Sequence, residues 1–107
     1  MTAEQEYMGA AVSAGCVIGN RRLGMCRGRV EFHHIASGSS LRSDFCGAGL
    51  CTEHHTGATG FHGMGLRAFN ALYRLPGECE FGLVVWSIED LARRKRYFKS
   101  NEPGGPR

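Results

Sequence analysis

The pattern of apolar and polar positions along the chain predicts a β-hairpin followed by helices. Residues 29–34 alternate as a β-strand does, and residues 47–51 make a second short strand after a polar stretch of Gly and Ser. Later apolar residues recur at helical spacing. They are Leu66, Phe69, Leu72 and Tyr73 in one stretch, and Leu83, Val84, Ile88 and Leu91 in another. We therefore expect an α+β fold in which two helices pack their apolar residues on the hairpin.

A short helix is predicted directly after the second strand. Thr52 is the expected N-cap, and the helix carries Glu53, His54 and His55 before Gly57 ends it. The predicted order is therefore strand, loop, strand, helix.

Length and composition indicate a single domain over residues 15–98. A chain of 107 residues allows only a modest core, which a bound metal ion could stabilise. Residues 1–14 lack a strong periodic apolar face, so we expect a flexible start with at most a short helix. Residues 99–107 are rich in Gly and Pro and are expected to be a disordered tail.

Cysteine content indicates a reducing compartment. Five cysteines, an odd number, occur without a signal peptide, which is typical of cytoplasmic proteins whose thiols act as ligands or core residues. Cys46 and Cys79 are expected to be packing residues. No apolar run is long enough to span a bilayer. We therefore expect a soluble, cytoplasmic protein with no membrane partner.

The histidines are clustered. Four of the five stand in two adjacent pairs, His33–His34 and His54–His55, and His62 follows within one short loop. Histidine both binds divalent metals and exchanges protons near neutral pH. The clustering predicts a metal-centred site more readily than a set of incidental residues.

The histidine pairs belong to a longer pattern between Gly15 and Tyr73. It comprises Glu31-Phe32-His33-His34-Ile35, Asp44, Leu50-Cys51-Thr52-Glu53-His54-His55-Thr56-Gly57, and Phe61-His62-Gly63 with Phe69 and Tyr73 after it. This pattern resembles the HNH endonucleases, and most closely the phage recombination-enhancement (Ref-type) RecA-dependent nucleases. The resemblance implies a small ββα-metal core, also called a His-Me finger, with additional C-terminal helices.

Phosphodiester hydrolysis needs a base to activate water and a cation to neutralise charge at the phosphate. The resemblance implies that His33 ligates the catalytic ion and that His34 is the general base. Neighbouring strand residues face opposite ways, so we expect the strand to end there for both to serve one site. His55 and His62 are the further expected ligands. Mg²⁺ is the expected ion, although histidine-rich sites also take Zn²⁺, Mn²⁺ or Ni²⁺.

Two carboxylates near the first histidine pair receive different interpretations. The resemblance places Asp44 roughly where the family has a central Asn, which orients the base by hydrogen bonds. Asp44 could equally be a metal ligand or a residue that only caps the loop. Glu31 is expected to be only a strand residue.

The resemblance also implies a structural zinc site, with a departure from the family's pattern. Relatives often carry two Cys-x-x-Cys pairs, whereas here Gly19 stands in the second place of the first pair and His54 in the second place of the other. Cys26 could substitute from the next turn. The expected zinc ligands are then Cys16, Cys26, Cys51 and His54; the alternative is a cluster of thiols without metal.

Basic residues lie near the predicted site. Net charge is +3, and we expect phosphate contacts from the arginines before the first strand and from two later ones. These residues are Arg21, Arg22, Arg27, Arg29, Arg42 and Arg67. The cluster Arg93-Arg94-Lys95-Arg96 has two open interpretations, a nucleic-acid contact or a favourable interaction with a helix C-terminus.

Together, these features predict a metal-dependent DNA endonuclease with a histidine base, acting in phage or prophage recombination or DNA processing in a bacterial host. By resemblance, a RecA-type filament is a further expected partner. A zinc-stabilised nucleic-acid-binding module without catalysis is the alternative from another class, and an RNA-directed enzyme of the same fold is a third.

Overall fold

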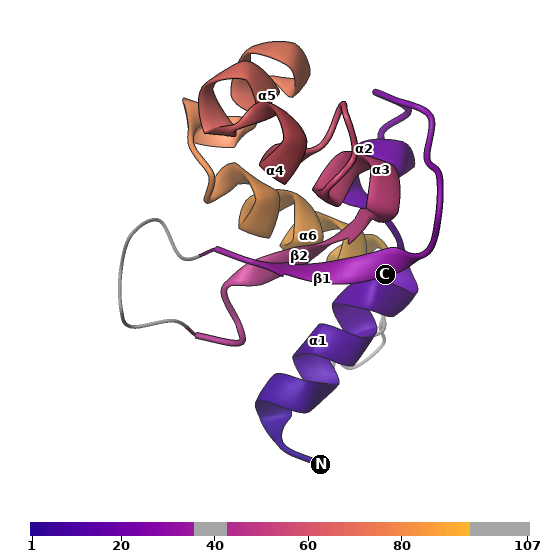
Figure 1. The fold of residues 1–107 in the computed structure, drawn as a ribbon. Helices are drawn as coiled ribbons and strands as arrows, with labels where there is room; N and C mark the ends of the chain where they lie inside the picture. The colour runs from indigo at the N-terminus through magenta and orange to yellow at the C-terminus, as the bar shows by residue number, and fades with distance from the viewer. Residues whose placement is uncertain (36–42, 95–107) are drawn as a thin grey trace.

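The architecture is α+β, as expected, with two antiparallel strands and six α-helices in the part of the chain that a computed structural model describes, residues 1–35 and 43–94 (Figure 1). In chain order the elements are α1 (Ala3–Ala14), α2 (Val17–Asn20), β1 (Val30–His34), β2 (Gly47–Cys51), α3 (Thr52–His55), α4 (Phe61–Met64), α5 (Leu66–Tyr73), a 3₁₀ turn (Pro76–Glu78) and α6 (Gly82–Arg94). Arg42, the domain's expected end at residue 98 and the expected tail lie outside the described residues.

The two strands form a hairpin whose register runs from Val30 opposite Cys51 to His34 opposite Gly47. β2 is buried along its whole length. Gly49 allows β2 to pack closely against the end of α1, because a Cβ atom at position 49 would lie 2.8 Å from the carbonyl oxygen of Gly15. The absent side chain lets the end of α1 lie directly against β2.

The expectation of a flexible N-terminus is wrong, because residues 3–14 form helix α1, which packs on the hairpin. Tyr7, Ala11 and Ala14 are buried at helical spacing, and the Tyr7 hydroxyl donates to the carbonyl of Gly47 at 3.0 Å. The buried face consists mainly of alanine, which gives little hydrophobic contrast. The apolar period is therefore weak in the sequence although the helix is well packed.

The two later helices are present as α5 and α6, but their apolar stripes are only partly core. Figure 1 shows α6 behind the hairpin and α5 above it, and α6 contacts both β2 and α1. The buried members of the two predicted stripes are Phe69, Tyr73, Leu83 and Leu91. Leu66 and Leu72 of α5 are exposed. Ile88 is also exposed, because α6 turns Trp86 and Ser87 inward instead.

Among the described residues, no helix is both long enough and apolar enough to span a membrane.

Candidate metal centres

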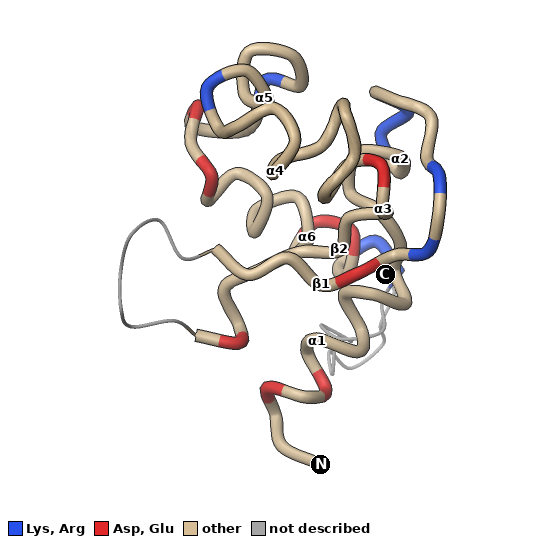
Figure 2. The backbone as a smooth tube through the Cα atoms, viewed as in Figure 1, with Lys and Arg blue, Asp and Glu red and all other residues tan. Residues whose placement is uncertain are grey.

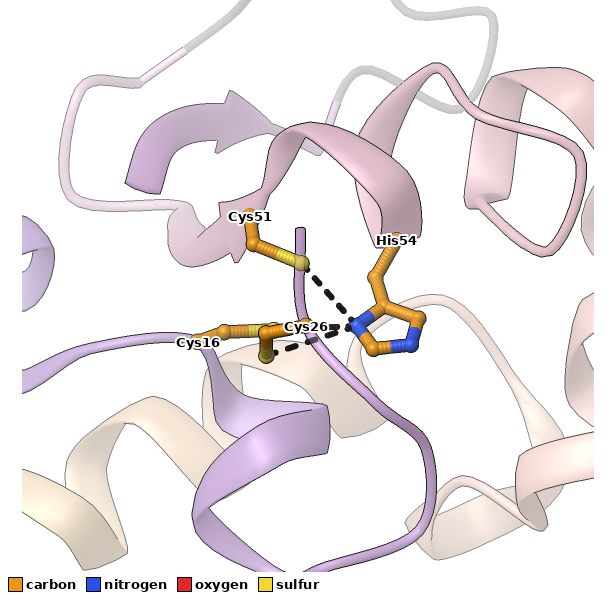
Figure 3. Close-up of side chains that lie close together, drawn as sticks. All are labelled: Cys16, Cys26, Cys51 and His54. Atoms are coloured by element: carbon orange, nitrogen blue, oxygen red, sulfur yellow. Dashed lines mark hydrogen bonds between the residues drawn. The ribbon is translucent and has the colours of Figure 1, made fainter. Parts of the chain in front are cut away.

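Three cysteines and one histidine converge beside the hairpin, and we call them the cysteine centre (Figure 3). Cys16 precedes α2, Cys26 lies between α2 and β1, Cys51 ends β2, and His54 belongs to α3. Their four ligand atoms all lie within 4.8 Å of one another. The sequence analysis expected this grouping, and the four residues are close enough to bind a metal ion.

The geometry at His54 fits a tetrahedral cation. Its Nδ1 atom lies 3.1 Å from Cys51 Sγ, 3.5 Å from Cys16 Sγ and 3.8 Å from Cys26 Sγ. One ring nitrogen has a single lone pair or proton, so it cannot make good hydrogen bonds to three sulfurs at once. A tetrahedral zinc with usual bond lengths would place nitrogen and sulfur about 3.5 Å apart, close to all three distances.

Gly19 explains how Cys26 takes the place of the missing cysteine. A Cβ atom at position 19 would collide with the Sγ atom of Cys26. The thiol of Cys26 thus fills the space beside α2 that a side chain at position 19 would need. Gly24 is similarly required, since a Cβ atom there would lie 2.7 Å from Nε2 of His54.

The thiols differ in how easily they ionise. Burial raises the pKa of Cys16, and burial together with the neighbouring thiols raises the pKa of Cys26 to about 12. Burial opposes ionisation of Cys51 too, but backbone N–H groups of His54 and Arg27 and contacts with the other thiols lower its pKa overall. Binding of a thiolate-seeking cation would therefore release protons from Cys16 and Cys26.

Helix α3 delivers its two histidines to different places. Cys51, not Thr52 as predicted, is the N-cap residue, and the Thr52 hydroxyl donates to the carbonyl of Arg29 at 3.3 Å. Adjacent helical residues diverge by about 100°. His54 consequently faces the cysteine centre, while His55 points toward a second cluster.

That second cluster consists of His33 from β1, His55 from α3 and His62 from α4, and we call it the histidine centre. Their ligand atoms also lie within 4.8 Å of one another. His33 is 2% exposed, His55 is partly buried and His62 is exposed. The histidine centre therefore opens to solvent on the side of His62.

His33 is held in the form that binds cations. Burial, followed by the nearby rings of His55, His62 and His34, lowers the pKa of His33 to about 3. The ring is therefore uncharged at neutral pH, with a lone pair on one nitrogen.

Two carboxylates orient this centre, and sequence reasoning missed both roles. Glu31 Oε1 accepts from Nδ1 of His55 at 2.8 Å, and Glu80 Oε2 lies 3.2 Å from Nε2 of His33. Such partners fix which ring nitrogen remains for a cation. The two-residue spacing of Glu31 and His33, which puts both on one face of β1, was the available signal. Glu80 lies just before α6 and has no sequence signal.

His34 lies on the other face of β1 from His33. Its ring packs edge-on against Phe32, two residues earlier, with 4.9 Å between ring centres. Its Nε2 atom is 2.8 Å from Asp44 Oδ1, and a carboxylate there can only accept, so Nε2 carries the proton. β1 includes His34 as its last residue, so the strand does not end early enough to bring both rings to one face.

The predicted phosphate-binding arginines divide into two groups. Arg21 is engaged in a fixed network, because its guanidinium pairs with Glu89 at 3.0 Å and Asp90 at 3.1 Å and stacks on Trp86. Arg21 therefore braces α2 against α6, and its guanidinium is occupied by these contacts within the protein.

The other described arginines of the prediction are exposed: Arg22, Arg27, Arg29 and Arg67. Figure 2 shows basic positions on the segment between α2 and β1 and on α5. Of the C-terminal cluster, Arg93 pairs with Asp90 at 3.0 Å and Arg94 donates to the carbonyl of Ser13 at 3.3 Å. These contacts favour a bracing role for both; Lys95 and Arg96 lie outside the described residues.

The two cysteines outside the cysteine centre differ. Cys46 is half-buried and packs against the main core, as expected. Cys79 is exposed, so the expectation that it is a packing residue is wrong. It lies between the 3₁₀ turn and α6.

Comparison of the chain with protein-family models, curated proteins and solved structures found no match.

Proposed function

We propose that the protein is a metal-dependent endonuclease of the HNH type, which hydrolyses phosphodiester bonds in DNA at the histidine centre. The observation that carries the proposal is the meeting of His33, His55 and His62 beside a further histidine, His34, that is oriented by Asp44. The order β1, β2, α3, with ligands on the first strand and the helix, also agrees with the proposed ββα-metal core.

The donor set narrows the choice of cation. Three imidazole nitrogens suit zinc and nickel better than magnesium, which prefers oxygen ligands and keeps its waters. We therefore propose a transition-metal ion such as Zn²⁺ or Ni²⁺ in place of the Mg²⁺ expected from the sequence. When bound, such an ion supplies charge stabilisation at the phosphate and at the leaving oxygen.

His34 has the geometry of a general base. Its proton sits on Nε2 against Asp44, which leaves the lone pair of Nδ1 for a water molecule. Hydrolysis displaces the leaving oxygen in line, so a base that activates the water and a group that stabilises the leaving oxygen would act from opposite sides of the phosphorus. We propose that His34 and the histidine centre, which lie on opposite faces of β1, would act from the two sides of a bound phosphate in this way.

The exposed arginines supply a phosphate-binding surface in this proposal. Arg22, Arg27 and Arg29 lie on the segment that leads into β1, and Arg67 lies on α5 beyond the histidine centre. Contacts with backbone phosphates position DNA without reading its sequence. A RecA-type filament as partner rests on the family resemblance alone.

A second candidate is a zinc-stabilised nucleic-acid-binding module without catalysis. The closed cysteine centre beside the core favours it, because four protein ligands with no open position are typical of structural zinc. In that case His33, His55 and His62 would have no catalytic ion, and no metal would produce cleavage.

The test compares the wild type with His34→Ala on supercoiled and single-stranded DNA. Each protein is incubated with Mg²⁺, Mn²⁺, Zn²⁺ or Ni²⁺, with and without a RecA filament. We expect cleavage by the wild type only, with equal DNA binding and equal thermal stability of both proteins. Cleavage by the variant would refute His34 as the base, and the absence of cleavage with every ion would favour the binding module.

A further inference from the structure

The three sulfurs of the cysteine centre differ in their access to solvent. Cys16 and Cys51 are 4% and 1% exposed, whereas Cys26 is an exposed residue. All three sulfurs nevertheless lie within 4.8 Å of one another. An oxidant in solution would therefore meet Cys26 first and would find a partner thiol directly behind it.

The segment that carries Cys26 is also the least restrained part of the centre. Cys16 and Cys51 sit at the ends of regular elements, α2 and β2. Residues 24–26, in contrast, make no backbone–backbone hydrogen bond within the described part of the chain. A sulfur–sulfur bond needs a separation of about 2 Å, and this segment can shift by the required amount without disrupting a helix or strand.

We propose that Cys26 is an oxidation site, through which peroxide converts the cysteine centre into a disulfide and expels its cation. The Cys26 sulfur attacks one oxygen of the peroxide, and the O–O bond breaks. The products are a sulfenic acid on Cys26 and one molecule of water. A buried sulfur, Cys16 or Cys51, then attacks Cys26, the S–O bond breaks and a second water leaves. The two thiolates of the loaded centre lose two electrons in all, and the peroxide takes up these electrons and two protons from solvent to become two waters.

Loss of two thiolate ligands removes the basis for a tetrahedral site. The remaining donors, one cysteine and His54, are too few to hold the cation tightly. Cys51 is the N-cap residue of α3, and His54 lies within this helix. The same helix carries His55 of the histidine centre. Oxidation at Cys26 would thus loosen the helix that positions a ligand of the second centre.

The test loads the purified protein with zinc and adds hydrogen peroxide. Released zinc is followed with a chromogenic chelator, and disulfides are mapped by mass spectrometry of peptides. Cys79→Ser is the matched control, because Cys79 is exposed but lies outside the centre. We expect the wild type and Cys79→Ser to release one equivalent of zinc together with a disulfide that contains Cys26.

Cys26→Asp supplies the decisive variant, because a carboxylate can ligate zinc but cannot form a disulfide. We expect it to keep its zinc under peroxide, and His34→Ala to respond like the wild type, since the reaction does not involve cleavage. A wild type that retains zinc while Cys79 is oxidised would overturn the proposal. So would a disulfide without Cys26, or zinc release from Cys26→Asp at the wild-type rate.

Discussion

The two histidines of α3 are neighbours in the sequence, yet they belong to centres with opposite properties. His54 joins three cysteines in a site with four protein donors, of which three are buried. His55 joins two other histidines in a site that is exposed at His62. A full set of four protein donors suits a structural ion, whereas three donors leave a coordination position for a substrate. The difference teaches that the number and type of donors, more than histidine content, separate a structural role from a chemical one.

The largest effect should come from removing a buried ligand of the cysteine centre. We expect Cys51→Ala to abolish cooperative unfolding, because structural zinc contributes on the order of 10 kcal/mol, which is comparable to the whole stability of a small domain. Circular dichroism during heating, with the zinc content of the sample, measures this. Cys46→Ala is the control, since Cys46 packs on the core outside the centre. Equal melting of the two variants would contradict a structural ion.

Removing an exposed ligand of the histidine centre should have the opposite signature. We expect His62→Ala to lose DNA cleavage by about 10²-fold or more, since the ion's charge stabilisation contributes several kcal/mol. Its thermal stability should remain that of the wild type, because His62 is exposed and the cysteine centre keeps its own four donors. Single-turnover cleavage and melting curves on the same preparation check this. Unfolding of His62→Ala would mean that both centres are structural.

A smaller effect is expected from the carboxylate that orients His55. Glu31→Gln should weaken cation binding at the histidine centre by about 10–100-fold, since an amide orients the ring less well than a carboxylate. Titration with Ni²⁺ measures the affinity. Glu53→Gln is the matched control, because the hydrogen bonds of the Glu53 carboxylate within residues 1–35 and 43–94 come from Thr59 and not from a histidine of that centre. Equal cation affinities of the two variants would refute the role of Glu31 in orienting His55.

The smallest effects should distinguish neighbouring arginines. Arg22→Ala should lower the dependence of DNA affinity on salt by about one unit of slope, as expected for one phosphate contact. Arg21→Ala should keep that slope and instead cost about 1–3 kcal/mol of stability, because the buried carboxylate of Asp90 loses a partner. Binding isotherms at several salt concentrations and melting curves separate the two. A loss of stability in Arg22→Ala together with a lower salt dependence in Arg21→Ala would refute the assignment of Arg22 to DNA binding and of Arg21 to stability.

The sequence predicted much of the fold and the ligand sets, for physical reasons that can be named. Period-two alternation placed the hairpin, with β2 at residues 47–51 as expected and β1 beginning one residue later than expected. Helical divergence predicted that His54 and His55 would serve different sites. Cys16, Cys26, Cys51 and His54 were expected together from the family resemblance, although their spacing departs from the family's pattern, and they are adjacent in space.

Other features depend on contacts between distant parts of the chain, which local patterns do not reveal. The burial of α1 depends on Tyr7 reaching Gly47. Glu80 reaches His33 across 47 positions of sequence, and Arg21 reaches Asp90 across 69. No periodicity in the sequence encodes such pairings. The contacts of Arg21 with α6 and of Glu80 with the histidine centre could therefore not be predicted from the sequence.

The most direct test of the two-centre account is graded chelation of the purified protein, with DNA cleavage and far-UV circular dichroism followed in the same samples. The account predicts two stages: cleavage disappears first while the fold persists, and added Zn²⁺ or Ni²⁺ restores cleavage, whereas stronger chelation then unfolds the chain. Loss of cleavage and fold in a single step, or cleavage that survives until unfolding, would contradict the assignment of a structural and a catalytic centre.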